Sequence, residues 1–341
     1  MAGGMEAIAS DLRRSLGVDG LARLAPLKGG LLFIAGGTGF VGTWLSALVA
    51  HLNDEHGFRT RVTSLSRRPS RLAAQAPFLA NRDDLQLVEG DVRGFTQVPA
   101  GVEWVINAAG SPDSRAHATS PIETASTIAD GTAHLLRAVE GSGRLRNFLH
   151  LSSGLIGSEG VRPVGASSIY ADAKRYSEAL CAAYRTQARL PVVIARPFTF
   201  MGPFQPLDAP WAANNFLHAA LNGRPLKLLG SGKVARAYLY GSDMAVLALT
   251  QLVGGRSGET YDLGGVEPVL LIDLAEMVLA SAGRPLEIRL NTAGRDGPSD
   301  DRLVPDMTRS MQAFGFKPAF GPQDTVARTL QWHRASPTAS A

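Results

Sequence analysis

The chain has 341 residues, of which 45% are hydrophobic and 19% are charged, as is typical of a globular protein with a substantial core. The formal net charge is only +4 at pH 7, and the 34 basic residues form no run of the kind that binds nucleic acid. Cys181 is the only cysteine, so the chain can form no internal disulfide and we expect a reducing compartment, the cytoplasm.

The first segment of the chain reads as helical. Residues 5–27 alternate apolar and charged positions at helical spacing. Charged residues such as Glu6, Asp11 and Arg13 interrupt it, and it lacks the long apolar run of a signal peptide or membrane span. We therefore predict an N-terminal helical extension over residues 1–28.

From residue 29 onward, short apolar runs alternate with helical patterns. The predicted strands are 31–35, 61–65, 85–88, 104–107, 148–151 and 192–195. The clearest helical patterns between them are 41–50, 121–140 and 171–187. Strands that are hydrophobic throughout and alternate with helices indicate a parallel sheet covered on both faces. The sequence therefore predicts an α/β fold, a doubly wound parallel sheet, over residues 29–195.

Beyond residue 195, prolines and glycines loosen this rhythm. The pattern there predicts helices and short strands at 214–222, 238–240, 260–263 and 273–282. We expect 196–235 and 264–330 to form a smaller C-terminal substrate-binding lid over the carboxyl ends of the strands, where ligands bind in such folds. Residues 236–263 are expected to return to the main sheet, and 331–341 to form a flexible tail.

A glycine-rich turn follows the first predicted strand. Gly36, Gly39 and Gly42 stand in the spacing G-x-x-G-x-x-G and open a predicted helix. Glycines at such positions allow a tight turn and a close approach of backbone amides to a pyrophosphate at the helix N-terminus. Its place directly after the first strand favours a dinucleotide site.

Tyr170 and Lys174 are the second chemical signal. They are four residues apart in a predicted helix, so their side chains are neighbours on one face. A tyrosine hydroxyl ordinarily has a pKa near 10, and lowering that pKa to about 7 requires roughly 4 kcal/mol of preferential stabilisation of the phenolate. A nearby cation and a hydrogen-bond donor can supply it. Such a phenol suits proton transfer to and from an alcohol.

The glycine turn, the Tyr170/Lys174 pair and the segment Leu151-Ser152-Ser153-Gly154 together resemble the extended short-chain dehydrogenases/reductases, the nucleotide-sugar epimerase/dehydratase family. The resemblance runs from about residue 30 to about residue 330 and implies a Rossmann fold. It implies that Ser152 hydrogen-bonds the substrate hydroxyl, that Tyr170 transfers the proton and that Lys174 holds the nicotinamide ribose. Ser153 is expected either to contact substrate or to cap the strand end.

The resemblance also implies a set of dinucleotide contacts. The cofactor-binding residues that it predicts are Gly36, Gly39, Phe40, Val41, Gly42, Ser66, Arg67, Asp91, Val92, Asn107, Ala108, Ala109, Tyr170, Lys174 and Pro197. An acidic residue after the second strand would favour NAD. Ser66 and Arg67 stand there instead, and an arginine suits a 2′-phosphate because it binds phosphate in a charge-assisted, often bidentate way. We therefore predict NADP, with NAD as the second choice, and no metal.

Two C-terminal segments resemble the family's substrate loops. Arg196–Pro203 resembles the R-x-x-N-x-x-G-P loop, with Thr199 in place of the asparagine. The stretch around Arg236 resembles the one whose arginine clamps the substrate diphosphate, and Arg302 resembles a second diphosphate contact. The predicted substrate-binding residues are Ser153, Thr199, Asn215, Arg236 and Arg302. The predicted partner is a nucleotide-diphosphate sugar, with no nucleic acid and no membrane.

The residues around the tyrosine bear on the reaction. Family dehydratases carry an Asp-Glu pair directly after the Ser/Thr, where this chain has Ser153 and Gly154. The remaining Ser-Tyr-Lys set moves a hydride and a proton at one carbinol centre, expected to be C4. This predicts a 4-epimerase or an NADPH-dependent 4-ketoreductase. A 4,6-dehydratase would need acids from another segment, such as Asp113 or Glu159. The same motifs could also belong to a non-catalytic NADP-binding sensor or to a non-sugar ketone reductase.

The helix that carries Tyr170 also has a surface of small residues. Its alanines are Ala171, Ala173, Ala179, Ala182 and Ala183. Family members often dimerise through such helices, so the sequence predicts a homodimer. Close packing of the helix on its own sheet would use the same residues.

Overall fold

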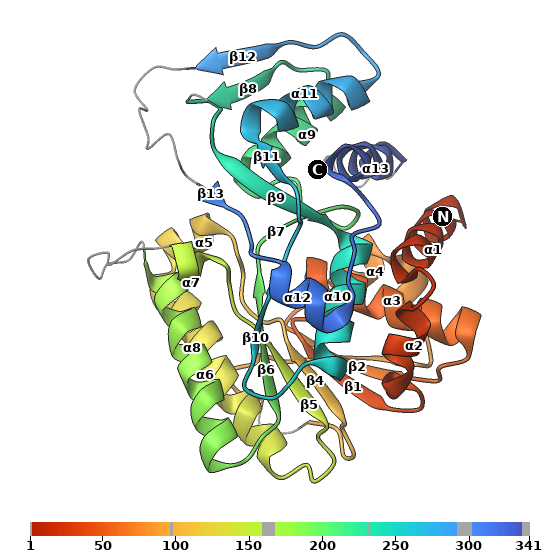
Figure 1. The fold of residues 1–341 in the computed structure, drawn as a ribbon, viewed down its shortest axis with the longest axis vertical. Helices are drawn as coiled ribbons and strands as arrows, with labels where there is room; N and C mark the ends of the chain where they lie inside the picture. Colours follow the sequence, from red (N-terminus) through yellow and green to blue (C-terminus); the bar gives the residue numbers. More distant parts are fainter. Residues whose placement is uncertain (1, 96–97, 159–167, 231, 292–301, 336–341) are drawn as a thin grey trace.

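The computed structural model describes residues 2–95, 98–158, 168–230, 232–291 and 302–335 (Figure 1). A parallel sheet of seven strands, in the order β10-β6-β5-β4-β1-β2-β3, forms its centre. These strands are β1 (Leu31–Ala35), β2 (Arg61–Ser66), β3 (Leu85–Glu89), β4 (Trp104–Asn107), β5 (Asn147–Leu151), β6 (Val192–Pro197) and β10 (Thr260–Leu263). The predicted doubly wound α/β fold is confirmed, and all six predicted strands lie in this sheet.

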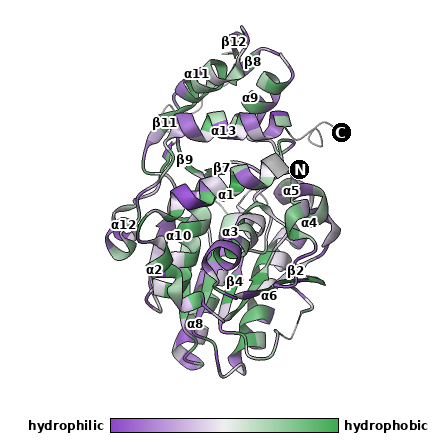
Figure 2. Cartoon of the chain, turned by 90° about the vertical axis from the view of Figure 1, so that its right-hand side faces the viewer, coloured by the Kyte–Doolittle hydropathy of each residue, from purple (hydrophilic) through white to green (hydrophobic). Residues whose placement is uncertain are grey.

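The sheet is buried on both faces, as its continuous apolar strands require. Every residue of β1 and of β5 is buried. Helices α6 (Pro121–Glu140) and α8 (Ile169–Gln187) cover one face, and α3 (Phe40–His56) and α10 (Gly241–Gly254) cover the other (Figure 1). Hydrophobic residues concentrate on the strands and on the helix faces turned toward them (Figure 2).

The order of the strands positions the site. The chain runs outward from β1 to β2 and β3, then returns to place β4 on the other side of β1. This reversal leaves a crevice beyond the carboxyl ends of β1 and β4, where ligands bind in open α/β sheets. The glycine turn follows β1, and Asn107 ends β4 with Ala108 and Ala109 after it, so both segments lie at this crevice.

The C-terminal part of the chain forms a smaller lobe with its own core. Strands β7 (Thr199–Met201), β9 (Ala235–Tyr240), β11 (Pro268–Leu270) and β13 (Arg302–Leu303) form one sheet of the lobe, and β8 (Leu226–Leu229) pairs with β12 (Ile288–Asn291). Its helices are α9 (Ala212–Leu221), α11 (Leu271–Ala282) and α13 (Pro322–Ala335). Leu217, Leu228 and Val278 are among the fully buried residues of its core.

Two expectations for this region need correction. Residues 238–240 do not return to the main sheet, because β9 pairs with β7, β11 and β13 of the lobe. The strand that does return is β10, which pairs with β6. Residues 331–335, expected in the tail, belong to α13, and residues 336–341 lie outside the described part of the chain.

The N-terminal extension folds as α1 (Ala2–Leu16) and α2 (Gly20–Leu24) and packs on the main domain. Ile8, Leu12 and Leu16 of α1 join the core that contains α3 and α10. The short remaining helices are η1 (Ala25–Leu27), α4 (Ser70–Gln75), η2 (Pro77–Leu79), α5 (Ser114–Thr119), α7 (Leu155–Ser158) and α12 (Thr308–Phe314). Within the described ranges, no helix is both long enough and apolar enough to cross a membrane.

Candidate active site

The glycine turn has the shape of a dinucleotide cradle. Gly36 has a φ of +86°, and a Cβ there would lie 2.6 Å from the carbonyl oxygen of Ala108, so only glycine fits. A Cβ at Gly42 would lie 2.5 Å from Gly37 Cα. At Gly39 a Cβ would lie 3.4 Å from Gly36 O, an ordinary van der Waals contact, so a side chain would fit there. Phe40 and Val41 begin α3, whose N-terminus has no side-chain cap and suits a pyrophosphate.

Ser66 and Arg67 lie next to this cradle, at the end of β2. The Ser66 hydroxyl is 2.6 Å from that of Thr38 in the glycine turn and accepts a hydrogen bond from Arg68 N. The Arg67 guanidinium is more than half exposed and pairs with Glu123 at 3.1 Å. Exposed ion pairs of this kind are weak, so Arg67 can exchange this partner for another anion.

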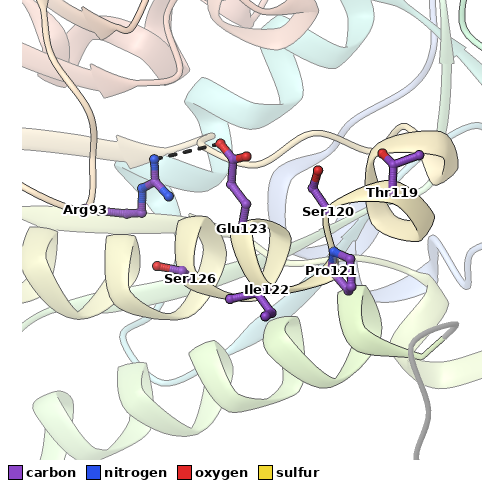
Figure 3. A pocket seen from close by; sticks show the side chains of 7 residues that line it. All are labelled: Arg93, Thr119, Ser120, Pro121, Ile122, Glu123 and Ser126. Carbon is purple, nitrogen blue, oxygen red and sulfur yellow. Dashed lines mark ion pairs between the residues drawn. The ribbon is translucent and has the colours of Figure 1, made fainter.

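A pocket of about 620 Å³ opens beside the end of β3 (Figure 3). Its lining residues are Arg93, Thr119, Ser120, Pro121, Ile122, Glu123 and Ser126. Asp91 lies close by and accepts hydrogen bonds from Arg93 N, Nε and Nη2 at 2.6 to 2.9 Å. These bonds from Arg93 lower the pKa of Asp91 to about 2. Val92 is buried against Gly131 of α6.

Asn107 faces inward at the end of β4. Its amide donates to Thr132 Oγ1 at 3.0 Å, and its Oδ1 accepts a hydrogen bond from Ala109 N at 3.3 Å. The side chain is almost fully buried, so it orders the exit of the strand rather than presenting its amide to the crevice. The backbone of Ala108 approaches the glycine turn directly, as its carbonyl contact with Gly36 shows.

Helix α8 brings Tyr170 and Lys174 together, as their spacing predicts. Lys174 Nζ lies 5.8 Å from the centroid of the Tyr170 ring and donates a hydrogen bond to Leu151 O at 2.7 Å. Burial lowers the pKa of Lys174 to about 8. Burial also raises the pKa of Tyr170, against the expectation of a lowered value, because the cost of desolvating the phenolate outweighs the hydrogen bond with Ser153.

The two serines at the end of β5 have different surroundings. Ser153 hydrogen-bonds the Tyr170 hydroxyl, and its own Oγ accepts a bond from Leu155 N at 3.2 Å. Ser152 is also buried, yet its Oγ has no hydrogen-bond partner within the described ranges. Burying a hydroxyl without a hydrogen-bond partner costs free energy, so the Ser152 hydroxyl is available to donate a hydrogen bond to a ligand.

The segment from β6 to β7 packs against the residues that follow β5. Pro197 O accepts a hydrogen bond from Gly154 N at 2.8 Å, and Thr199 begins β7 opposite Tyr238 of β9. A Cβ at Gly154 would lie 2.6 Å from the Phe198 ring, so this ring occupies the space into which a side chain at 154 would extend.

The predicted substrate residues of the lobe do not all converge. Arg236 is half-buried on β9, and its Nη1 donates to Ala235 O at 2.8 Å. Strand pairing sets Leu303 opposite Arg236 and Arg302 opposite Ala235. Successive side chains of a strand point to opposite faces, so Arg302 does not share the face of Arg236. The predicted pair of diphosphate contacts is therefore not formed by these two residues.

Asn215 is exposed on α9, whereas its neighbour Asn214 is fully buried. Asn214 donates to the carbonyl oxygens of Pro206 and Ala209 at 2.8 and 3.1 Å and so holds the loop that precedes α9. The sequence alone did not distinguish the structural asparagine from the exposed one.

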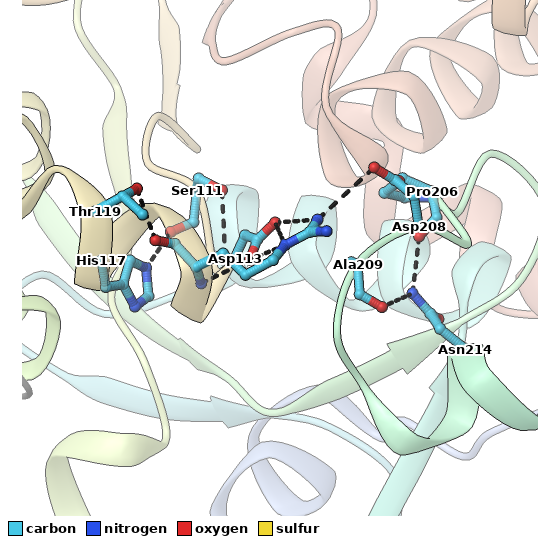
Figure 4. A network of polar contacts seen from close by, with 9 residues as sticks. Ser111, Asp113, His117, Thr119, Pro206, Asp208, Ala209 and Asn214 are labelled. Atoms are coloured by element: carbon cyan, nitrogen blue, oxygen red, sulfur yellow. Dashed lines mark hydrogen bonds and ion pairs between the residues drawn. The ribbon is translucent and has the colours of Figure 1, made fainter. Parts of the chain in front are cut away.

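Figure 4 shows a polar network between this loop and α5. Asp113 caps α5 by accepting from Arg115 N, and it also pairs with the Arg115 guanidinium. That guanidinium reaches Asp208 of the lobe loop at 3.7 Å. The bonds from Arg115 lower the pKa of Asp113, which favours the ionised form of this carboxylate. Glu159, the second acid that could serve a dehydratase, lies outside the described residues.

One aromatic contact of the site had no signal in the sequence. The imidazole of His117, on α5, stacks on the ring of Tyr170 with the centroids 4.4 Å apart and 15° between the planes. His117 lies 53 residues before Tyr170 in the chain, so only the folded structure brings the two rings together.

The fold and the site are those of a dinucleotide-binding oxidoreductase. The chain belongs to the NAD dependent epimerase/dehydratase family, whose family model matches residues 32–264. It is 28% identical over 315 residues to the dTDP-glucose 4,6-dehydratase of Streptomyces niveus, covering 89% of this chain and 92% of that protein. It is 25% identical over 314 residues to UDP-glucuronic acid decarboxylase 1 of Xenopus tropicalis, covering 89% of this chain and 72% of that protein.

Two solved structures have the same fold. The Bordetella bronchiseptica enzyme WbmF in complex with NAD+ matches with a TM-score of 0.78 and 21% identity, over 92% of this chain and 95% of that one. The UDP-glucuronic acid 4-epimerase of Bacillus cereus, in complex with UDP-glucuronic acid and NAD, matches with a TM-score of 0.74 and 20% identity, over 89% and 98%. The predicted family and Rossmann fold are confirmed.

Proposed function

We propose that this enzyme catalyses hydride transfer at one carbinol or keto carbon, C4, of a nucleotide-diphosphate sugar. The observation that carries the proposal is the composition of the site. Tyr170 is hydrogen-bonded by Ser153, and the buried hydroxyl of Ser152 has no partner among the described residues. Only glycine fits at Gly36 in the turn after β1, and positions 153 and 154 provide no carboxylate.

Each residue has one task in this scheme. A bound nicotinamide dinucleotide supplies the hydride acceptor or donor. The Tyr170 hydroxyl exchanges a proton with the C4 oxygen, and the Ser152 hydroxyl, which lacks a partner among the described residues, donates a hydrogen bond to that oxygen. Lys174 places its ammonium 5.8 Å from the centroid of the phenol ring, and it would hold the ribose of a bound cofactor. In the lobe, Arg236 takes the diphosphate, with Thr199 and Asn215 as further contacts.

Dehydration is the competing reaction, because the Streptomyces niveus relative is a 4,6-dehydratase. Eliminating the hydroxyl group of C6 needs a general acid beside the tyrosine. Ser153 and Gly154 cannot act as that acid at neutral pH, Arg115 favours the ionised form of Asp113, and the Phe198 ring fills the space beside Gly154. As far as the described part of the chain extends, these observations support a redox step without water loss.

Two reactions use this apparatus, and each has support. The phenol of Tyr170, whose pKa burial raises, is protonated at neutral pH, which is the state required to donate a proton in the reduction of a 4-keto sugar. The residues Ser66 and Arg67 support NADP as cofactor, which also suits a reductase. A 4-epimerase would oxidise C4 and then reduce it from the opposite face. Its support is the family, which includes epimerases.

We also propose a homodimer in the cytoplasm. Of the alanines on α8, Ala171 and Ala173 are buried within the subunit, whereas Ala179, Ala182 and Ala183 are exposed. Tyr176, on the same helix, is 56% exposed. Small exposed residues beside a large aromatic side chain suit close packing against a second copy of the helix.

The test is to incubate the purified enzyme with UDP-, dTDP-, GDP- and CDP-sugars and their 4-keto forms, with and without NADPH, and to identify products by NMR. Turnover of a sugar without added NADPH selects the epimerase, and a strict requirement for NADPH selects the reductase. The proposal fails if no nucleotide sugar binds, or if the product has lost water.

A further inference from the structure

His117 and Tyr170 come from different parts of the fold and meet face to face. His117 lies on α5, which follows β4, and Tyr170 lies in the first turn of α8, which follows β5. Their rings are nearly parallel at a centroid separation of 4.4 Å. Stacked ring pairs at such distances stabilise each other beyond the effect of the area that they bury.

A hydrogen bond holds the ring of His117, and the helix that carries this residue is capped. His117 Nε2 donates a hydrogen bond to Ser111 O at 2.7 Å, so this nitrogen carries a proton and the ring is fixed at its outer edge. Asp113, two residues after Ser111, caps the N-terminus of α5 by accepting a hydrogen bond from Arg115 N at 2.8 Å. The imidazole is therefore a fixed surface against which another ring can rest.

Within the described residues, the polar contacts of Tyr170 leave the orientation of its ring unrestrained. The hydrogen bond with Ser153 restrains only the hydroxyl at the tip of its side chain. Lys174 lies 5.8 Å from the ring centroid, and its ammonium is already bonded to Leu151 O. The imidazole of His117 is stacked on the face of the ring, where it can restrain the plane of the ring and the direction in which the hydroxyl points.

We propose that His117 is a positioning residue for Tyr170, which holds the phenol in the plane from which its hydroxyl reaches the substrate oxygen. This inference rests on the proposed role of Tyr170 in proton transfer. A reacting group displaced by about 1 Å can lose on the order of 100-fold in rate, so a contact that only orients the phenol has a measurable effect on catalysis.

The experiment compares His117→Ala, which removes the ring, with His117→Phe, which keeps a flat ring and removes the nitrogens. His134→Ala is the matched control, because His134 is another helix histidine whose ring bonds a backbone carbonyl, that of Asp130, outside the site. We expect His117→Ala to lower kcat on the order of 10- to 100-fold with KM almost unchanged. His117→Phe should keep most of the activity, and His134→Ala all of it.

Crystal structures of the variants give a readout that does not depend on activity. We expect the Tyr170 ring to turn away in His117→Ala and to keep its place in His117→Phe. An unmoved ring in His117→Ala overturns the proposal, as does a loss of kcat in His117→Phe equal to that in His117→Ala. If the wild type turns over no nucleotide sugar, the proposed function fails, and the ring position alone decides the role of His117. If His117→Ala does not fold, His117→Leu replaces it, since leucine fills space without a flat ring.

Discussion

The hydroxyl of Ser153 hydrogen-bonds the phenol of Tyr170, while the hydroxyl of Ser152, one residue earlier, is buried without a partner among the described residues. Both serines lie at the end of β5, where neighbouring residues of an extended chain point in opposite directions. The two hydroxyls therefore have separate tasks. Ser153 holds the tyrosine, and Ser152 is left to bind the oxygen of the substrate.

Alanine substitutions separate these tasks. Ser152→Ala should lower kcat on the order of 100-fold, as the loss of a donor to the reacting oxygen typically does. It should leave the melting temperature unchanged or slightly raised, because it removes a buried hydroxyl that is unpaired in the free enzyme. Ser153→Ala should lower kcat less, since the tyrosine remains present. Steady-state kinetics and thermal unfolding check both variants, and the reverse order of kcat values would transfer the substrate contact to Ser153.

The pKa of Lys174 predicts the alkaline limb of activity. Because this pKa lies at about 8, the ammonium beside Tyr170 is lost as the pH rises through that value, and we expect kcat/KM to fall there. Stability should not fall with it. The ordinary pKa of lysine is about 10.4, so between these two values the unfolded chain binds more protons and stability rises with pH. Constant activity between pH values of about 7 and about 9.5 would contradict the proposed role of the ammonium.

The cofactor preference depends on the end of β2. Ser66→Asp places a carboxylate where a ribose 2′-hydroxyl would donate and a 2′-phosphate would be repelled. We expect this variant to prefer NAD over NADP by at least about tenfold in Kd, a change of about 1.4 kcal/mol. Arg67→Ala should weaken NADP more than NAD, because the arginine is proposed to bind the additional phosphate. Equal affinities of the wild type for the two cofactors, unchanged in both variants, would refute the assignment.

Besides its apolar contacts, the N-terminal extension is joined to the rest of the protein by a buried carboxylate. Asp11 of α1 accepts hydrogen bonds from Tyr240 Oη at 2.6 Å and from Arg328 of α13, and only 3% of its surface is exposed. Asp11→Ala leaves a buried phenol and a guanidinium without their partner, and we expect it to cost about 3 kcal/mol of unfolding free energy. Asp19→Ala, which breaks the exposed pair with Arg23, should cost under about 0.5 kcal/mol. Denaturant unfolding of the two variants measures the difference, and equal midpoints would show that the extension is not fastened there.

The sequence predicted the main sheet well because its strands carry a strong local signal. Runs such as Leu31–Ala35 and Phe148–Leu151 are buried at every position, which a strand covered on both faces requires. The strand after residue 235 has the same local character, yet it belongs to the lobe. Which sheet a short strand joins depends on distant partners, here β7, β11 and β13, and local composition does not encode them.

In the site too, local features were predictable from the sequence and contacts between distant elements were not. The spacing of Tyr170 and Lys174 was sufficient to bring them together, because it is a property of one helix. The raised pKa of Tyr170 was not predictable from that spacing, since it depends on how completely the fold excludes water. The stacking of His117 on Tyr170 and the placement of Arg302 across from Ala235 likewise depend on contacts between separate elements.

An isotope label tests most directly whether the enzyme transfers a hydride at C4 only and eliminates no water. For an epimerase, a nucleotide sugar carrying deuterium at C4 is converted, and for a reductase, a 4-keto sugar is reduced with NADPH deuterated at its transferable position. In both cases we predict deuterium at C4 of a product that has kept all its oxygens, as measured by NMR and mass spectrometry. Deuterium at C6 of a product that has lost water would contradict the account and identify a 4,6-dehydratase.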